Sequence, residues 1–203
     1  MNNLFDIRGK VALVTGGSRG IGEMIAAGFL ANGVKVYISS RKAEVCNATA
    51  ARLMEQFGGE CISLPANLAE VTGCQQLADE LAARESQLDI LINNAGVSWG
   101  APIDDFPESG WDKVMDTNVK GVFFLTQKLL PLLRQSGSAE DPARVVNVGS
   151  IDGLKNPVFE TFSYGPSKAA LHHLTRGLAL HLTRQHIIVN AIATDPEGLP
   201  LTW

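Results

Sequence analysis

Tyr164 and Lys168 are the residues of this chain whose types and spacing offer the most specific chemistry. Residues four apart on a helix share one face, so the ammonium group would lie near the phenol. A neighbouring positive charge favours the phenolate and lowers the pKa of a tyrosine, which lets the phenol give or take a proton near neutral pH. Such a pair is also common on exposed helices without any reaction, so the surrounding sequence has to decide.

A glycine-rich segment, TGGSRGIG at 15–22, lies between a predicted strand and a predicted helix. Gly16, Gly20 and Gly22 let the chain turn sharply and bring its backbone close to a pyrophosphate, and the third also allows close helix packing. The helix that follows presents free N–H groups and a partial positive charge. A glycine turn without a ligand is the alternative, but this position after the first strand favours a dinucleotide site.

The end of the second predicted strand bears on the choice of nicotinamide cofactor. An NAD site places an acidic residue there to bind the ribose 2′-hydroxyl, whereas this chain reads SSRK at 39–42. Arg41 and Arg19 can pair with a 2′-phosphate, and Ser40 can donate a hydrogen bond to it. Both arginines are alternatively solvated surface charges. The sequence predicts NADP(H).

Short apolar runs alternate with segments of helical periodicity along the chain. The predicted strands cover 10–14, 34–39, 60–64, 88–92, 144–148 and 187–192. The predicted helices follow the glycine turn and cover 43–57, 71–84, 112–134 and 164–184. Short strands rich in Val and Ile that alternate with helices indicate an α/β fold, a parallel sheet covered on both faces. We expect a single doubly wound domain of Rossmann type over residues 1–203.

Composition excludes several classes of protein. The 203 residues carry a net charge of −4 and no basic stripe, which argues against a nucleic-acid partner. We find no apolar stretch of about 20 residues and no signal peptide, so we expect no membrane partner and a cytoplasmic location. Cys46, Cys61 and Cys74 lack metal-ligand spacing and are predicted to be reduced thiols. We expect no metal site.

Further motifs follow in order along the chain. Asn93-Asn94-Ala95-Gly96 comes after the fourth predicted strand, Asn118 falls in a long predicted helix, and Ser150 closes the fifth strand. Together with TGGSRGIG and the Tyr-x-x-x-Lys pair, these motifs resemble the short-chain dehydrogenase/reductase family in its NADP-preferring branch. The resemblance runs from about residue 9 to residue 192.

The resemblance implies roles for individual residues. It makes Asn118, Ser150, Tyr164 and Lys168 the catalytic set. Ser150 would hydrogen-bond the substrate oxygen where negative charge develops, and Asn118 would hold a water or kink its helix as part of a proton relay. The implied cofactor-binding residues are Gly16, Ser18, Arg19, Gly20, Ile21, Gly22, Ser40, Arg41, Asn67, Leu68, Asn94, Ala95, Gly96, Tyr164 and Lys168.

Two positions depart from the family pattern. Asn67 stands where the family usually has an Asp that contacts adenine, and an Asn keeps a carbonyl acceptor while adding donors. After the last predicted strand the family runs into Pro-Gly, whereas this chain has Asp195-Pro196-Glu197-Gly198. A family member continues for about fifty further residues, judged from the usual size of such a domain. We therefore expect the C-terminal strand and the substrate-lid region to be absent or incomplete.

The substrate is predicted from fewer residues. Apolar surface for an acyl chain or hydrophobic ketone is offered by Trp99, Leu154, Val158, Phe159 and Phe162, although ordinary packing explains these side chains equally well. The stretch 136–144 and the sequence YGPSKAAL resemble bacterial 3-oxoacyl-[acyl-carrier-protein] reductases, including the rhamnolipid-associated type. We expect NADPH-dependent reduction of a 3-oxoacyl thioester or similar ketone, with Tyr164 as general acid.

Other interpretations stay open. An alcohol or sugar dehydrogenase of the same family would share every motif, and a non-catalytic dinucleotide-binding protein would keep the fold without turnover. The resemblance also implies a homo-oligomer, a dimer or tetramer, because the helices predicted at 112–134 and 164–184 contact a neighbouring subunit in the family. Leucines along the second of these helices are equally well explained by core packing.

Overall fold

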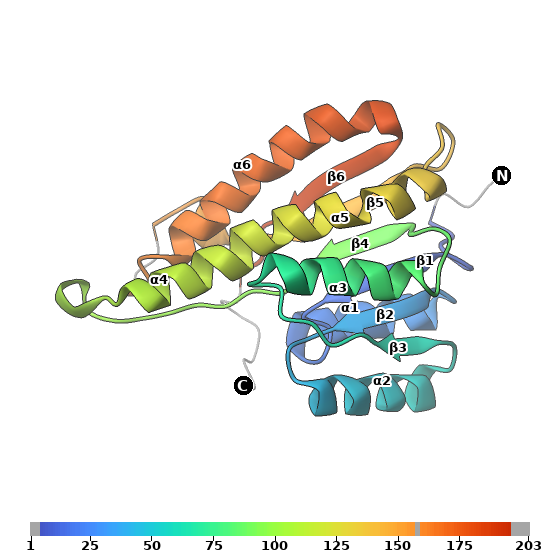
Figure 1. Ribbon diagram of the computed structural model, residues 1–203, viewed down its shortest axis with the longest axis horizontal. Helices are drawn as coiled ribbons and strands as arrows, with labels where there is room; N and C mark the ends of the chain where they lie inside the picture. The colour runs from blue at the N-terminus through green and yellow to red at the C-terminus, as the bar shows by residue number, and fades with distance from the viewer. Residues whose placement is uncertain (1–4, 157–158, 196–203) are drawn as a thin grey trace.

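Six parallel strands form one sheet in the order β3-β2-β1-β4-β5-β6 (Figure 1). The computed structural model describes residues 5–156 and 159–195. Its strands are β1 Val11–Thr15, β2 Lys35–Ser39, β3 Cys61–Ser63, β4 Ile90–Asn93, β5 Ala143–Val148 and β6 Ile187–Ile192. Its α-helices are α1 Gly20–Ala31, α2 Ala43–Phe57, α3 Val71–Ala82, α4 Glu108–Met115, α5 Gly121–Ser136 and α6 Tyr164–Leu182.

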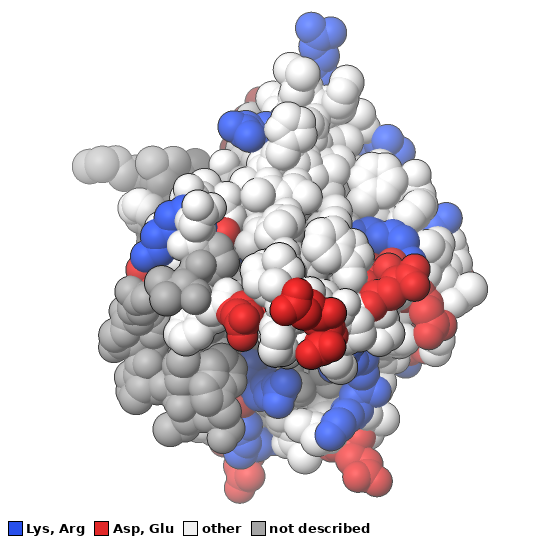
Figure 2. Space-filling model, turned by 90° about the vertical axis from the view of Figure 1, so that its left-hand side faces the viewer, with Lys and Arg blue, Asp and Glu red and all other residues white. Residues whose placement is uncertain are grey.

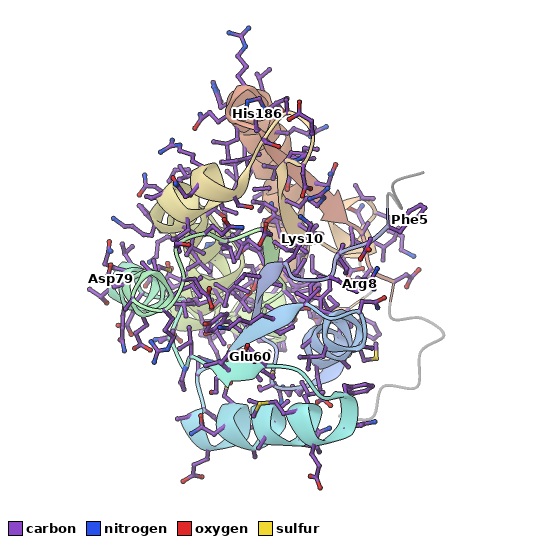
Figure 3. All side chains as sticks on the ribbon, turned by 90° about the vertical axis from the view of Figure 1, so that its right-hand side faces the viewer. Phe5, Arg8, Lys10, Glu60, Asp79 and His186 are labelled. Atoms are coloured by element: carbon purple, nitrogen blue, oxygen red, sulfur yellow. The ribbon has the colours of Figure 1, made fainter. Side chains whose placement is uncertain are left out.

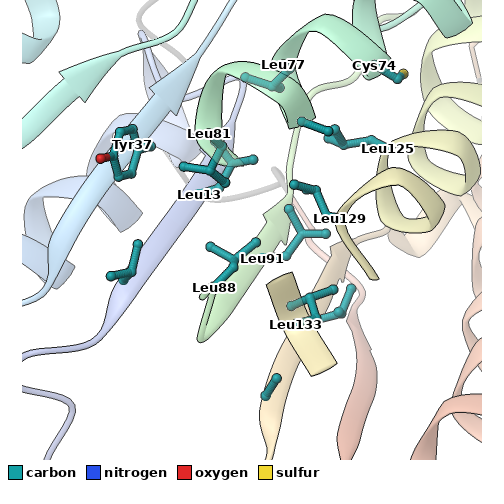
Figure 4. Close-up of a cluster of buried hydrophobic side chains, with 14 of the residues drawn as sticks. Leu13, Tyr37, Cys74, Leu77, Leu81, Leu88, Leu91, Leu125, Leu129 and Leu133 are labelled. Atoms are coloured by element: carbon teal, nitrogen blue, oxygen red, sulfur yellow. The ribbon is translucent and has the colours of Figure 1, made fainter. Parts of the chain in front are cut away.

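Helices cover both faces of the sheet, and each face has its own apolar core. Alternate side chains of β1 point to opposite faces, as the period of a strand requires: Leu13 joins one core and Val14 the other. On one face the sheet packs against α3 and α5, as the cluster in Figure 4 shows, and also against the end of α6. On the other face it packs against α1 and α2. The doubly wound α/β prediction is therefore confirmed.

The strand order reverses between β1 and β4. The chain moves outward from β1 to β3, returns to pair β4 with β1, and then continues on the other side to β6. Val14 near the end of β1 is the register partner of Ile92 in β4. The connections that follow these two strands cross opposite faces of the sheet, and in such sheets the carboxyl edge between the two strands forms a crevice. In open α/β sheets such a switch point is where ligands bind.

The helix predicted at 112–134 has an internal change of geometry. It consists of α4, a π-helical turn at Asp116–Lys120, and α5. The backbone remains close to helical throughout, so an apolar pattern cannot distinguish one wide turn from continuous α-helix. A π-turn commonly marks a functional position, and this one contains Asn118.

A cluster of polar side chains lies at the amino edge of the sheet, where the strands begin, opposite the carboxyl edge. Lys10 Nζ lies 2.6 Å from Asp141 Oδ2 and 3.8 Å from Asp89 Oδ1. Asp89 is buried and also accepts hydrogen bonds from the Val11 N–H and from Ser136 Oγ, at 2.8 and 2.6 Å. Figure 3, which views this end, shows Lys10 near its centre. The cluster joins the starts of β1 and β5 and leaves the carboxyl edge to the crevice.

Some sequence expectations lie outside the described residues. These are the ones that concern Val158, the segment 196–203 and any strand or lid beyond it. Among the helices of the described ranges, none combines the length and the apolar character needed to cross a membrane.

Candidate active site

Most of the predicted site residues lie on five segments at the carboxyl edge of the sheet, and the others follow β2 and β3. The glycine-rich turn follows β1, the Asn94–Gly96 segment follows β4, and Ser150 follows β5. Tyr164 and Lys168 stand on the first turns of α6, and the π-turn supplies Asn118. Figure 2 views the end of the molecule where α4 lies and shows basic side chains gathered below a band of acidic ones.

Two glycines of the glycine-rich turn, Gly16 and Gly22, lie too close to Asn94 to be replaced by a residue with a side chain. A Cβ on Gly16 would lie 2.8 Å from Asn94 Nδ2, and one on Gly22 would lie 2.4 Å from the same atom and 2.3 Å from the Gly16 carbonyl oxygen. Gly20 has a φ of +55°, and a Cβ there would meet nothing within 4 Å. The turn is therefore closed against β4 and open on the side of Gly20, which leaves backbone free to approach a pyrophosphate.

Thr15 holds the two loops of the crevice together, a role that the sequence did not reveal. Its Oγ1 accepts hydrogen bonds from the N–H groups of Asn94 and Ala95, both at 3.0 Å, and donates to the Ile92 carbonyl at 3.2 Å. Asn94 Nδ2 in turn donates to the Thr15 carbonyl at 2.9 Å. The threonine that opens TGGSRGIG is the sequence signal, but its partner becomes visible only when β1 and β4 are known to be neighbours.

Two arginines of the predicted phosphate site lie at the surface of the protein. Arg19 and Arg41 are both exposed, and neither guanidinium makes an ion pair or a hydrogen bond within residues 5–156 and 159–195. Ser18 is buried, and its carbonyl accepts a hydrogen bond from Thr49 Oγ1 of α2 at 3.0 Å. Two unpaired cations beside a glycine turn fit a ligand with an additional phosphate.

The predicted adenine contacts are less available than expected. The Asn67 amide donates to Glu70 Oε1 at 2.8 Å, and its Oδ1 accepts from the Ala69 N–H at 3.4 Å. Leu68 points into the core beside α3 and α5. An adenine contact from Leu68 would therefore use its backbone, and one from Asn67 would compete with Glu70.

Tyr164 and Ser150 form the centre of the site. Burial raises the pKa of the Tyr164 phenol, a hydrogen bond with the Ser150 side chain acts in the opposite direction, and the charge of Asp152 raises it. Ser150 is itself buried, and its Oγ accepts a hydrogen bond from the Asp152 N–H at 3.2 Å. The phenol is therefore protonated at neutral pH and lies beside a second hydroxyl.

The expectation that Lys168 lowers the pKa of Tyr164 is not met. Lys168 Nζ lies 5.6 Å from the centroid of the Tyr164 ring and donates to the Val148 carbonyl at 2.8 Å. The lysine is 4% exposed, and this burial lowers its own pKa to about 8. Spacing alone placed the pair on one helical face but could not show that β5 supplies the partner of the ammonium group.

Both the oxygen and the nitrogen of the Asn118 side-chain amide form hydrogen bonds to neighbouring segments. Oδ1 accepts from the Val97 N–H and Nδ2 donates to the Val97 carbonyl, both at 2.9 Å. Nδ2 also donates to Ser167 Oγ at 3.0 Å, and Ser167 donates to the Tyr164 carbonyl at 2.7 Å. An ideal Cβ on Gly96 would lie 3.5 Å from both Asn118 Oδ1 and Lys168 Nζ. Three predicted residues, Gly96, Asn118 and Lys168, therefore lie next to one another. Ser167 bonds to this group, and the sequence did not single it out.

The apolar residues suggested for substrate binding divide into two groups. Trp99 packs on α4, because a Cβ on Gly110 would lie 2.6 Å from its Cδ1, and Lys113 Nζ lies 5.0 Å from its ring centroid. Leu154 and Phe159 are 66% and 78% exposed. The packing interpretation therefore holds for Trp99, whereas the segment after Ser150 presents apolar surface beside the site.

The fold and the site together define a class, the dinucleotide-dependent oxidoreductases with a Ser-Tyr-Lys centre. Residues 10–196 match the family model described as short chain dehydrogenase. The chain belongs to this family, and the predicted membership is confirmed.

Similar proteins refine the comparison. The chain is 52% identical to the rhamnolipids biosynthesis 3-oxoacyl-[acyl-carrier-protein] reductase of Pseudomonas aeruginosa, over 95% of this chain and 75% of the relative. Gluconate 5-dehydrogenase of Gluconobacter oxydans is 35% identical, over 94% of this chain and 72% of the relative. The solved Pseudomonas aeruginosa RhlG/NADP active-site complex superposes with a TM-score of 0.91 at 52% identity, covering 95% of this chain and 75% of that one.

Proposed function

We propose that the protein is an NADPH-dependent reductase of 3-oxoacyl thioesters or similar ketones, with Tyr164 as the general acid. The observation that carries the proposal is the centre formed by Ser150, Tyr164 and buried Lys168 at the carboxyl end of β5. The identity of 52% to a 3-oxoacyl-[acyl-carrier-protein] reductase supports this substrate class. The exposed apolar segment around Leu154 and Phe159 offers a surface for an acyl chain.

NADP(H) fits the residues of the crevice. The open side of Gly20 leaves room for the pyrophosphate, and Arg19 and Arg41 provide unpaired cations for the 2′-phosphate. The Asn94 side chain holds the start of the glycine-rich turn through its hydrogen bond to the Thr15 carbonyl. Gly96 places no side chain next to Lys168 Nζ. When bound, the reduced cofactor supplies the hydride. The relative of known structure with 52% identity was solved with NADP, which supports the same cofactor here.

The chain's own residues would handle the proton and the developing charge. Tyr164 is protonated at neutral pH because burial raises its pKa, so its phenol can give a proton to the ketone oxygen. Ser150 would donate a hydrogen bond to the same oxygen. The Lys168 ammonium, which is charged below a pKa of about 8, lies 5.6 Å from the centroid of the ring that loses the proton. Asn118 joins the π-turn to the Val97 backbone and to Ser167 of α6, the helix that bears Tyr164 and Lys168.

Tyr164→Phe tests the general-acid role. Turnover of a 3-oxoacyl thioester should fall about 10²- to 10⁴-fold, because the variant has no proton to give. NADPH binding, followed by fluorescence titration, should be unchanged because the ring remains. An unchanged rate would show that another group is the acid, and a wild-type chain that binds NADPH without reducing any ketone would favour the binding-protein alternative.

Arg41→Ala tests the cofactor preference. A charge-assisted hydrogen bond contributes about 1.5–3 kcal/mol, so the Kd for NADPH should rise roughly 10- to 100-fold. Binding of NADH, which lacks the 2′-phosphate, should stay as it is and serves as the internal control. If both cofactors weaken equally, Arg41 acts on the turn and not on the phosphate.

A sugar or alcohol dehydrogenase is the second candidate. The 35% identity to gluconate 5-dehydrogenase favours it, since that relative is matched over nearly the same length. Steady-state assays with a 3-oxoacyl thioester and with gluconate separate the two functions.

We also propose a homo-oligomer that uses the apolar groove between α5 and α6. The groove is lined by Phe123, Thr126, Gln127, Leu130, Leu178 and Leu182.

A further inference from the structure

His172 contacts the backbone of Ser150, the residue that would hydrogen-bond the substrate oxygen in the proposed function. It lies one helical turn after Lys168 on α6, and its Nε2 is 3.1 Å from the Ser150 carbonyl oxygen. A carbonyl only accepts, so Nε2 carries the hydrogen and donates.

Two glycines make room for the imidazole. An ideal Cβ on Gly149 would lie 2.3 Å from His172 Cε1, and one on Gly153 would lie 2.9 Å from His172 Cδ2. Neither glycine has a positive φ, so it is the close approach that requires a residue without a side chain. The ring therefore occupies a slot between the residue before Ser150 and the end of the short turn after it.

The imidazole completes the fixation of the Ser150 segment. On the side of β6, the Gly149 N–H donates to the Ile192 carbonyl at 2.7 Å, and Thr194 Oγ1 donates to the Gly149 carbonyl at 3.1 Å. On the side of α6, the Ser150 carbonyl accepts from His172, and it accepts as well from the Gly153 N–H at 3.0 Å. Two further bonds join α6 to this region, from Lys168 Nζ to the Val148 carbonyl and between the Tyr164 and Ser150 side chains, and among these three only the His172 bond holds the Ser150 backbone.

We propose that His172 is a positioning residue that holds the Ser150 hydroxyl against the Tyr164 phenol through its hydrogen bond to the Ser150 carbonyl. The proposal rests on the proposed function, because it gives His172 no role except through Ser150. Tyr164 and His172 stand on the same helix, so the imidazole ties the serine to the helix that bears its partner. A misplacement of about 1 Å at a reacting centre can cost about 10²-fold in rate.

A double-mutant cycle tests this dependence. His172→Leu keeps the volume and removes the donor, and kcat should fall about 10- to 100-fold with the Kd for NADPH unchanged. His172→Gln, whose amide can donate in place of Nε2, should retain most of the activity. His173→Leu, the matched substitution at the exposed neighbour, should behave as wild type. In a Ser150→Ala background, His172→Leu should cause no further loss, because coupled residues are not additive.

A second readout needs no turnover. The chain has two tyrosines, so in a Tyr37→Phe background the ultraviolet absorbance of phenolate reports Tyr164 alone. The hydrogen bond from Ser150 lowers the pKa of Tyr164. His172→Leu should therefore raise the pKa of Tyr164 toward that of Ser150→Ala, and His172→Gln should not.

The outcomes separate this inference from the proposed function. If Ser150→Ala lowers turnover but His172→Leu does not, the inference is wrong and the proposed function stands. A further loss in the Ser150→Ala background, or a glutamine variant as poor as the leucine variant, also overturns it. If the wild-type chain reduces no ketone, or Ser150→Ala leaves turnover unchanged, the proposed function fails. Should His172→Leu not fold, His172→Met, which also lacks a donor, replaces it in the double-mutant cycle and in the tyrosine titration.

Discussion

At the scale of single residues, Lys168 makes stability depend on pH. Burial lowers its pKa from 10.5 to about 8, so in this window the unfolded chain binds more protons than the folded one. The contribution of Lys168 to stability therefore rises with pH across the window, by at most about 1.4 kcal/mol per pH unit. Lys168→Met, which has no titrating group there, should lack this rise. Urea unfolding of both proteins without cofactor, on either side of the window, measures the difference.

Parallel stability curves for the two proteins would contradict this expectation and would give the lysine an ordinary pKa in the folded state. A confirmed rise would show that the fold keeps a destabilising buried charge at the place where the proposed reaction needs an ammonium group. Buried ionisable groups with displaced pKa values commonly mark functional sites. The test uses stability alone, so it is independent of any substrate.

The sequence indicates the residues that do chemistry more readily than those that position them. Tyr164, Lys168 and Ser150 are found from types and spacing, because proton transfer requires those types. Thr15, Ser167 and His172 are not, because each acts through a contact with a distant segment: β4, the π-turn and the end of β5. The direction of the pKa shift on Tyr164 also depends on burial, which spacing does not report.

At the scale of elements, Gly121 determines how closely α5 approaches the loop after β3. A Cβ at this position would lie 2.2 Å from the Leu68 carbonyl oxygen, and backbone cannot move aside as a flexible side chain can. Gly121→Ala should destabilise the protein by about 1–3 kcal/mol. It should also weaken NADPH binding, because the displaced loop belongs to the predicted adenine side of the crevice.

Gly28→Ala is the matched control. This glycine is exposed on α1, and a Cβ would meet nothing within 4 Å. The substitution should stabilise the protein by about 0.5–1 kcal/mol, since glycine is costly inside a helix. Denaturant unfolding of both variants gives the signs directly. Equal effects of the two substitutions would mean that helix propensity outweighs the approach of α5 to Leu68.

Element boundaries followed the sequence wherever periodicity was strong and local. The helix predicted at 43–57 coincides with α2, whose end is set by Gly58. The predicted helix at 112–134 begins at Glu108 instead, and its π-turn was not foreseen because a widened turn preserves the apolar pattern. The order β3-β2-β1-β4-β5-β6 depends on which face each connection crosses, and no single segment encodes that choice.

At the scale of the whole molecule, α5 and α6 lie side by side (Figure 1). Side chains of the two helices line an apolar groove between them. α5 follows the π-turn, and α6 bears Tyr164 and Lys168. A subunit packed in the groove would therefore contact both helices that support the site. Exposed apolar surface of this kind is typical of protein interfaces. The groove is therefore the surface on which the proposed homo-oligomer can be tested.

Phe123→Glu should disrupt that oligomer. Phe123 lines the groove, and a carboxylate at the centre of an apolar interface would be buried without a partner, at a cost of several kcal/mol. Light scattering after size exclusion should then show a smaller species, with a lower and concentration-dependent midpoint of thermal unfolding near the dissociation range. Val45→Glu, on exposed α2, places the same charge away from the groove and should keep the wild-type mass. A wild-type monomer, or a Phe123→Glu variant of unchanged mass, would assign the groove to internal packing and would leave α5 and α6 to hold the site without a neighbour.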